Sequence, residues 1–155
     1  MKTVSFTRLI EKLEKMIHMK VKNILEFKGS TLYQTSPGTN LITAIDSLNY
    51  YNVGALMVME SDKMKGIITE RDILGAITKY KADILKLKVS DLMTQKLITC
   101  NASDSIERIM DIMTNNHIRH VPVLEDNKLI GIISIGDIIE AILHKRSRTN
   151  SKNLL

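Results

Sequence analysis

An internal repeat constrains the fold of this 155-residue chain more than any other feature of its sequence. The segment GIITERDILGAI begins at Gly66 and recurs as GIISIGDIIEAI at Gly131, which lies 65 residues further along. The same spacing holds upstream without a gap, so that Val58 falls on Val123. The sequence therefore predicts two copies of one supersecondary unit, which pack together to complete a core.

The spacing changes near the start of the first copy. Val21–Leu25 matches Val89–Met93 at a spacing of 68, so the first copy carries three extra residues near positions 27–31. Because insertions are tolerated best in exposed connections, we expect these residues to form a loop.

Hydrophobic periodicity and turn residues give each copy the order strand, helix, strand, strand, helix. Leu41, Ala44, Ile45 and Leu48 show the spacing of an amphipathic helix, for example. The expected strands are 32–35, 55–59 and 65–69 in the first copy and 97–100, 121–124 and 129–134 in the second. The expected helices are 41–48 and 71–79, then 106–113 and 137–145.

A unit of this size covers its apolar sheet face poorly by itself. The sequence therefore predicts an α/β fold of two tandem β-α-β-β-α repeats, packed with pseudo-two-fold symmetry around a cleft lined by β-to-α turns. We assign residues 1–20 to an N-terminal helix, 21–86 to the first repeat, 87–146 to the second and 147–155 to a polar tail. Apolar residues at helical spacing in the first segment pack onto the repeats or contact a partner; these are Leu9, Ile10, Leu13, Met16 and Ile17.

Composition excludes several classes of protein. The single cysteine, Cys100, allows no internal disulfide and no cysteine-based zinc site. No apolar run is long enough to span a membrane, and the charged N-terminal stretch is no signal peptide, so we expect a cytoplasmic protein. The net charge of +5 gathers toward the ends of the chain, and no aromatic residues interleave with it, so we do not expect nucleic acid as a partner.

The motif most informative about ligand binding consists of a glycine, two apolar residues, a hydroxyl residue, any two residues and an aspartate. It supplies Thr69 and Asp72 in the first copy and Ser134 and Asp137 in the second. The motif lies where a strand enters a helix, a position suited to phosphate, and the aspartate could accept both hydroxyls of a ribose. The same spacing also fits an N-terminal capping box that needs no ligand, and the sequence leaves both readings open.

With this doubled motif the chain resembles the tandem CBS-domain (cystathionine β-synthase domain) pair, or Bateman module. Three further segments carry the resemblance: Val89–Thr94 (VSDLMT), Asn52–Leu56 (NVGAL) and His117–Val123 (HIRHVPV). It extends from about Val21 to about His144. The resemblance implies an adenosine-containing ligand, such as AMP, ADP, ATP, S-adenosylmethionine or NAD, and a homodimer.

The resemblance also implies roles for individual residues. Asp137 and Asp72 would take ribose hydroxyls, while Ser134 and Thr69 would face ribose or phosphate. Backbone groups of the short strands would read adenine, and Pro122 belongs to the same ligand-binding set. The strand residues concerned are Ile98, Thr99 and Cys100 in the second copy and Tyr33, Gln34 and Thr35 in the first.

The two predicted sites are not equivalent. Arg119 and His120 match a basic pair that meets phosphates, whereas Gly54 and Ala55 stand at the equivalent positions of the first copy. Arg71 is a separate phosphate candidate, because a guanidinium can bind phosphate through two hydrogen bonds. The sequence thus predicts a stronger site in the second copy, and the resemblance makes AMP the expected ligand.

No catalytic motif is present, and no carboxylate or cysteine cluster accompanies the histidines to form a metal site. We therefore expect a regulatory adenine-nucleotide sensor that needs no cofactor and acts on a separate, unidentified partner protein. The alternative is a ligand-free interaction scaffold whose aspartates only cap helices.

Overall fold

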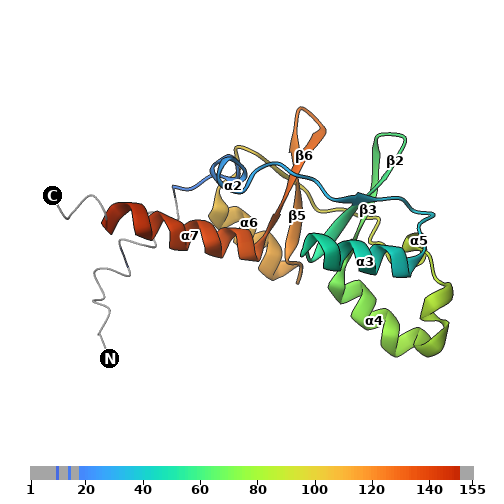
Figure 1. Ribbon diagram of the computed structural model, residues 1–155. Helices are drawn as coiled ribbons and strands as arrows, with labels where there is room; N and C mark the ends of the chain where they lie inside the picture. Colours follow the sequence, from blue (N-terminus) through green and yellow to red (C-terminus); the bar gives the residue numbers. More distant parts are fainter. Residues whose placement is uncertain (1–9, 11–13, 15–17, 151–155) are drawn as a thin grey trace, which may run out of the picture. The chain divides into compact units, whose positions relative to one another are not determined.

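The computed structural model describes residues 10, 14 and 18–150, with side chains as far as residue 143, and it separates into two compact α/β units (Figure 1). The first-copy unit is Thr31–Ile98. The second-copy unit joins the described parts of Met1–Ser30 and Thr99–Leu155. Each unit has its own three-stranded sheet.

The first-copy unit follows the predicted order of elements. Its strands are β1 (Gln34–Thr35), β2 (Ala55–Glu60) and β3 (Lys63–Thr69), and its helices are α3 (Leu41–Tyr51), α4 (Glu70–Tyr80), the 3₁₀ helix η1 (Lys81–Lys86) and α5 (Val89–Leu92). The sheet order is β1-β2-β3. Strand β1 runs parallel to β2, so the chain needs a crossover, which α3 supplies, while β2 and β3 form an antiparallel hairpin.

The second-copy unit repeats this arrangement. It contains β4 (Cys100–Asn101), α6 (Ile106–Asn115), β5 (His120–Glu125), β6 (Lys128–Ser134) and α7 (Ile135–Asn150), with α2 (Val21–Lys28) added from the N-terminal side. The strand register is the same in both sheets, and the bulge after Val58 recurs after Val123. The prediction of two α/β repeats is confirmed.

The ends of several elements differ from the prediction. The first strand of each copy has only two residues, and in the second copy it begins at Cys100 rather than at 97. Helix α7 continues to Asn150, beyond the predicted end at 145 and into the expected tail, because residues 146–150 include no glycine or proline that would end it. Of the predicted N-terminal helix over 1–20, most residues lie outside the described part; Ile10 is described and exposed.

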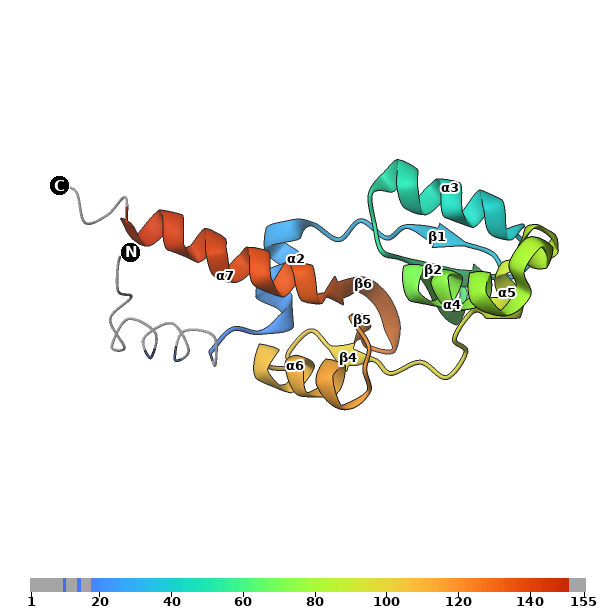
Figure 2. The same ribbon diagram turned by 90° about the horizontal axis from the view of Figure 1, so that it is seen from below.

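Each unit is completed by the short helix that precedes the other copy in sequence. The Lys22 N–H donates to the Ala102 carbonyl (2.9 Å) and the Ile106 N–H to the Met19 carbonyl (2.9 Å), which fixes α2 to the second-copy unit. In the first-copy unit the Val89 N–H donates to the Thr39 carbonyl (2.9 Å) and fixes α5 in the same way. Figure 2 shows α2 beside α7. Each compact unit therefore differs from its sequence copy, because it contains the short helix that precedes the other copy.

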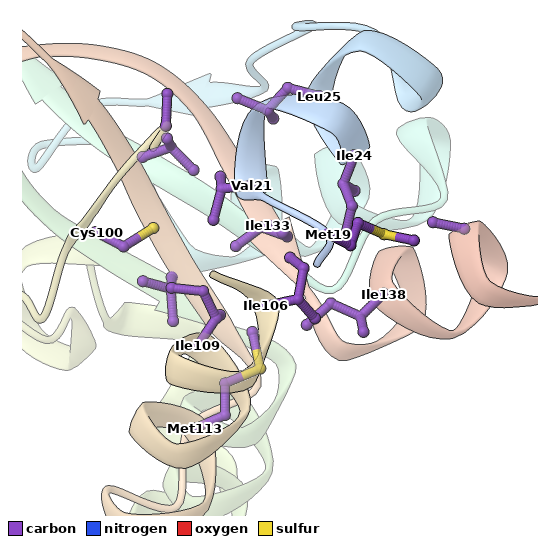
Figure 3. Close-up of a cluster of buried hydrophobic side chains, with 14 residues drawn as sticks. Met19, Val21, Ile24, Leu25, Cys100, Ile106, Ile109, Met113, Ile133 and Ile138 are labelled. Carbon is purple, nitrogen blue, oxygen red and sulfur yellow. The ribbon is translucent and has the colours of Figure 1, made fainter. Parts of the chain in front are cut away.

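Each unit is stabilised by its own hydrophobic cluster. In the second-copy unit, Met19, Val21 and Ile24 from the α2 segment pack with Ile106 of α6 and Ile133 of β6 (Figure 3). The first-copy cluster has these buried members: Leu41, Ala44, Leu48, Leu56, Val58, Ile68, Ile73 and Val89. Both are aliphatic, as the low aromatic content of the sequence requires.

The three extra residues of the first copy lengthen a helix as well as a loop. Helix α2 has eight residues, whereas the equivalent α5 has four. Its end is set by Gly29, whose φ of 85° favours glycine and whose N–H donates to the Leu25 carbonyl (2.9 Å). The expected loop over 27–31 is therefore wrong for Phe27 and Lys28, which belong to the last turn of α2.

Candidate functional site

The aspartate of the first-copy motif closes a capping box at the start of α4. The Thr69 N–H and hydroxyl both donate to Asp72 Oδ2, at 2.8 and 2.7 Å. In return the Asp72 N–H donates to Thr69 Oγ1 (3.4 Å). The capping interpretation of this motif is confirmed.

The second-copy motif makes the same reciprocal pair at the start of α7. The Ser134 N–H donates to Asp137 Oδ2 (2.7 Å), and the Asp137 N–H donates to Ser134 Oγ (3.1 Å). Capping does not exclude ligand binding, because a carboxylate offers more acceptor sites than one cap uses. It does mean that both aspartates are already held in a defined orientation.

A backbone hydrogen bond at each junction further reduces the number of helix amides that are free to bind a ligand. The Glu70 N–H donates to the Gly54 carbonyl (3.1 Å), and the Ile135 N–H donates to the Arg119 carbonyl (3.0 Å). The first and third amides of α4 and α7 therefore already have acceptors. A phosphate at either junction would depend on side-chain cations more than the sequence analysis assumed.

The second-copy unit brings four predicted residues together at this junction. His120 pairs with Ser134 in the β5–β6 register, so their side chains lie on the same face of the sheet. Arg119 precedes β5, is exposed, and is tied through its carbonyl to the first residue of α7. Asp137 is the third residue of that helix. The four residues thus lie close together along the backbone at the start of α7.

The first-copy unit has fewer candidate ligand-binding residues at the equivalent junction. Ala55 pairs with Thr69 where the second copy has His120 with Ser134. Arg71 is exposed at the start of α4, and Thr35 lies in β1 opposite Val58. Of the predicted adenine-reading residues of the second copy, Ile98 ends the first-copy unit, and Thr99 and Cys100 begin the other.

Pro122 changes the hydrogen bonding of the short strands. In the first-copy unit the Met57 N–H donates to the Tyr33 carbonyl (3.0 Å). Pro122 stands at the position equivalent to Met57, and proline has no N–H to donate. The carbonyl of Ile98, which is equivalent to Tyr33, therefore lacks the donor that its first-copy counterpart has.

Cys100 is a packing residue in β4. Its side chain belongs to the buried cluster of the second-copy unit (Figure 3), and the residue is 3% exposed. The pKa of the thiol is raised from 9.0 to about 12, chiefly by burial and then by the charge of Asp104, while Arg108 opposes the shift. Cys100 is therefore no reactive thiol at neutral pH.

The Cys100 pKa predicts a loss of stability at alkaline pH. The unfolded chain releases this proton near pH 9.0, whereas the folded chain keeps it to about 12. The free energy of unfolding is therefore unaffected by the thiol below pH 9 and falls between 9 and 12, by about 1 kcal/mol per pH unit. Urea unfolding at pH 8, 9 and 10 should show this slope to be shallower in Cys100→Ala. Equal slopes in both proteins would contradict it.

The sequence analysis missed one residue of the site, Lys28. Its ammonium lies 2.7 Å from Asp137 Oδ2 and donates to the Ile132 carbonyl at 2.8 Å. The side chains of Lys28 and Asp137 are 21% and 19% exposed, so the pair is largely shielded from water. The change of spacing from 65 to 68 marked this segment, but nothing in the sequence placed it against α7.

Within the described residues, no group of three or more histidine, cysteine, aspartate or glutamate side chains could hold a metal ion. In the same part of the chain, no helix combines the length and the apolar character needed to cross a bilayer.

Comparison with known proteins identifies relatives over most of the chain. The CBS domain family model matches residues 32–79 and 89–144. The CBS domain-containing protein CBSX3, mitochondrial, of Arabidopsis thaliana is 42% identical over 122 residues, which are 76% of this chain and 59% of the plant protein. The chain thus spans less than two thirds of that relative's length.

Solved structures of CBS-domain proteins share the fold. The CBS-domain containing protein ATU1752 of Agrobacterium tumefaciens is 36% identical, with a TM-score of 0.77 over 79% of this chain and 98% of that one. The CBS domain pair of protein MJ0100, solved in complex with 5′-methylthioadenosine and S-adenosyl-L-methionine, is 26% identical, with a TM-score of 0.70 over 82% and 98%. The chain belongs to the CBS-domain family and carries two copies of the domain in tandem.

Proposed function

We propose that this protein is a regulatory module that binds an adenine nucleotide, AMP, ADP or ATP, and transmits its occupancy to a partner protein. The observation that carries the proposal is the grouping of Arg119, His120, Ser134 and Asp137 at the start of α7, through the strand register and two hydrogen bonds. The complex of the MJ0100 domain pair with two adenosyl compounds supports an adenosine-containing ligand.

Each group has a part in the proposed complex. Asp137 accepts hydrogen bonds from ribose hydroxyls, and the Ser134 hydroxyl donates a hydrogen bond to ribose or phosphate. Arg119 offers a planar pair of donors to a phosphate, with His120 beside it. Backbone groups of Ile98, Thr99 and Cys100 read the edge of adenine.

The first-copy junction is the weaker candidate. Thr35, Thr69, Arg71 and Asp72 would form its ligand set, without the basic pair at the start of β2. The Asp72 carboxylate accepts two bonds from Thr69 alone, and the Tyr33 carbonyl is already bonded to Met57. We expect AMP to fill the second-copy site first.

Transmission needs a second protein surface. Ile73 of α4 and Ile138 of α7 are buried in their own hydrophobic clusters, so a dimer contact must use other side chains of these helices. The large apolar side chains that are exposed in the described parts of the same helices are Leu74 and Ile77 of α4 and Ile135, Ile139 and Leu143 of α7. We propose that these faces pair two copies of the chain, which light scattering tests against the 17.5 kDa monomer mass.

A module of this kind needs no cofactor and catalyses no reaction, and its compartment in our proposal is the cytoplasm. Its ligand can shift a partner's binding only by its differential affinity for two states of the module. The alternative is a scaffold that binds no ligand and whose aspartates serve only as helix caps.

Thermal unfolding with added nucleotide tests the proposed function. A ligand present at 100 times its dissociation constant should add about 2.7 kcal/mol to the free energy of unfolding. Millimolar AMP, ADP and ATP should therefore raise the melting temperature, and Arg119→Ala should reduce this effect more than it reduces the effect of adenosine. If no adenine nucleotide shifts the transition, the scaffold alternative is the better description.

A further inference from the structure

Lys28 lies outside the proposed ligand set, but its ammonium contacts Asp137, the residue predicted to accept the ribose hydroxyls. Asp137 Oδ2 accepts from both the Ser134 N–H and Lys28 Nζ, each at 2.7 Å. Lys28 comes from α2, 109 residues away in sequence, and its position depends on the extra turn of that helix. The contact joins two segments of one compact unit.

Among the described residues, the first-copy unit has no equivalent lysine contact at the strand that precedes its motif hydroxyl. There the Ile67 carbonyl accepts the Thr94 N–H (2.9 Å), and the Ile67 N–H donates to the Thr94 carbonyl (3.0 Å). In the second-copy unit the equivalent carbonyl, that of Ile132, accepts Lys28 Nζ instead. A backbone pair in one unit is thus replaced by a cation in the other.

We propose that Lys28 is a specificity-determining residue of the Asp137 site, which selects phosphorylated adenylates over neutral and cationic adenosyl compounds. This inference rests on the proposed function. The ammonium compensates the charge of Asp137, so the site does not repel an anionic ligand. The compensation comes from a largely shielded group, where charge effects are stronger than at an open surface.

The ligand classes should respond differently to this ammonium. Ribose hydroxyls that bind Asp137 compete with a charge-assisted hydrogen bond, which weakens adenosine binding. A phosphorylated ligand makes the same exchange but gives the released ammonium an anionic partner. A ligand with a sulfonium, such as S-adenosylmethionine, places a second positive charge near Lys28 and should bind least well.

The test is an NMR titration of the full chain with AMP, adenosine and S-adenosylmethionine. Amides of 134–138 report on the Asp137 site, and amides of 69–73 report on the Asp72 site, so the two affinities are measured separately. Lys28→Met keeps the length of the side chain but removes its charge. Lys22→Met is the matched control, because Lys22 is an exposed lysine of the same helix.

We expect Lys28→Met to lower the ratio of AMP affinity to adenosine affinity at the Asp137 site by roughly tenfold or more, the scale of one hydrogen bond to a charged group. Binding of S-adenosylmethionine should improve. Lys22→Met should leave the ratio unchanged, and Lys28→Arg, which keeps the charge, should preserve most of the preference for AMP.

The outcomes separate this inference from the proposed function. If Lys28 only ties α2 to α7, Lys28→Met lowers the melting temperature and weakens AMP and adenosine equally, and the inference is overturned. The same holds if the ratio does not change. If neither the unaltered protein nor any variant binds an adenosyl ligand, the proposed function fails and the inference falls with it.

Discussion

Gly66→Ala is expected to destabilise the first-copy unit by about 3 kcal/mol, the upper end of the usual cost of overpacking. A Cβ at this position would lie 2.7 Å from the Thr94 carbonyl oxygen and 3.2 Å from Met93 Sδ. The oxygen cannot move away freely, because Thr94 and Ile67 exchange two backbone hydrogen bonds. The change must therefore either strain the chain or break that pair.

Gly131→Ala is the matched control in the second-copy unit. Its Cβ would meet Leu25 Cδ2 at 2.9 Å, which is the end of a flexible side chain rather than a backbone atom. We expect a smaller cost, about 1 kcal/mol, because Leu25 can change rotamer. Urea unfolding of both variants measures the difference. A cost for Gly131→Ala as large as that for Gly66→Ala would contradict the argument.

These glycines also show what the sequence could predict and what it could not. The repeated motif located both β-to-α junctions, and the constant spacing of 65 matched the register and the bulge of the two hairpins. The motif did not show why Gly66 is needed. The reason is the close approach of Thr94, which follows α5 and is 28 residues away in sequence.

Contacts between distant segments account for most of what the sequence analysis missed. Periodicity describes which face of an element is apolar, but not which sheet covers it. It therefore gave no sign that α2 completes the second-copy unit, or that Lys28 reaches Asp137. The end of α7 was misplaced for a different reason, since a polar composition alone does not stop a helix.

The two readings of the aspartate motif could not be separated by sequence, because capping and ribose binding need the same residue type at the same position. The structure confirms the caps and leaves ligand binding as a proposal. Because Asp137 pairs with Lys28, an Asp137→Asn variant should lose stability without ligand as well as affinity with it.

Ile133→Ala and Ile68→Ala are expected to cost about 3 to 4 kcal/mol each, the usual scale for removing a buried isoleucine. The two residues are equivalent positions of β6 and β3, and both are fully buried. Each lies in a different hydrophobic cluster, so the loss should fall on its own unit. A loss of this size is a large share of the 5–15 kcal/mol that stabilises a typical domain.

Native-state hydrogen exchange can assign each loss to its unit. Ile133→Ala should lower the protection of amides in β5 and β6 more than in β2 and β3, and Ile68→Ala should do the reverse. Leu85→Ala, at a position 64% exposed in η1, is the control and should change stability by less than about 0.5 kcal/mol. Equal loss of protection in both sheets from either core variant would mean that the two clusters unfold as one cooperative unit, despite their separate cores.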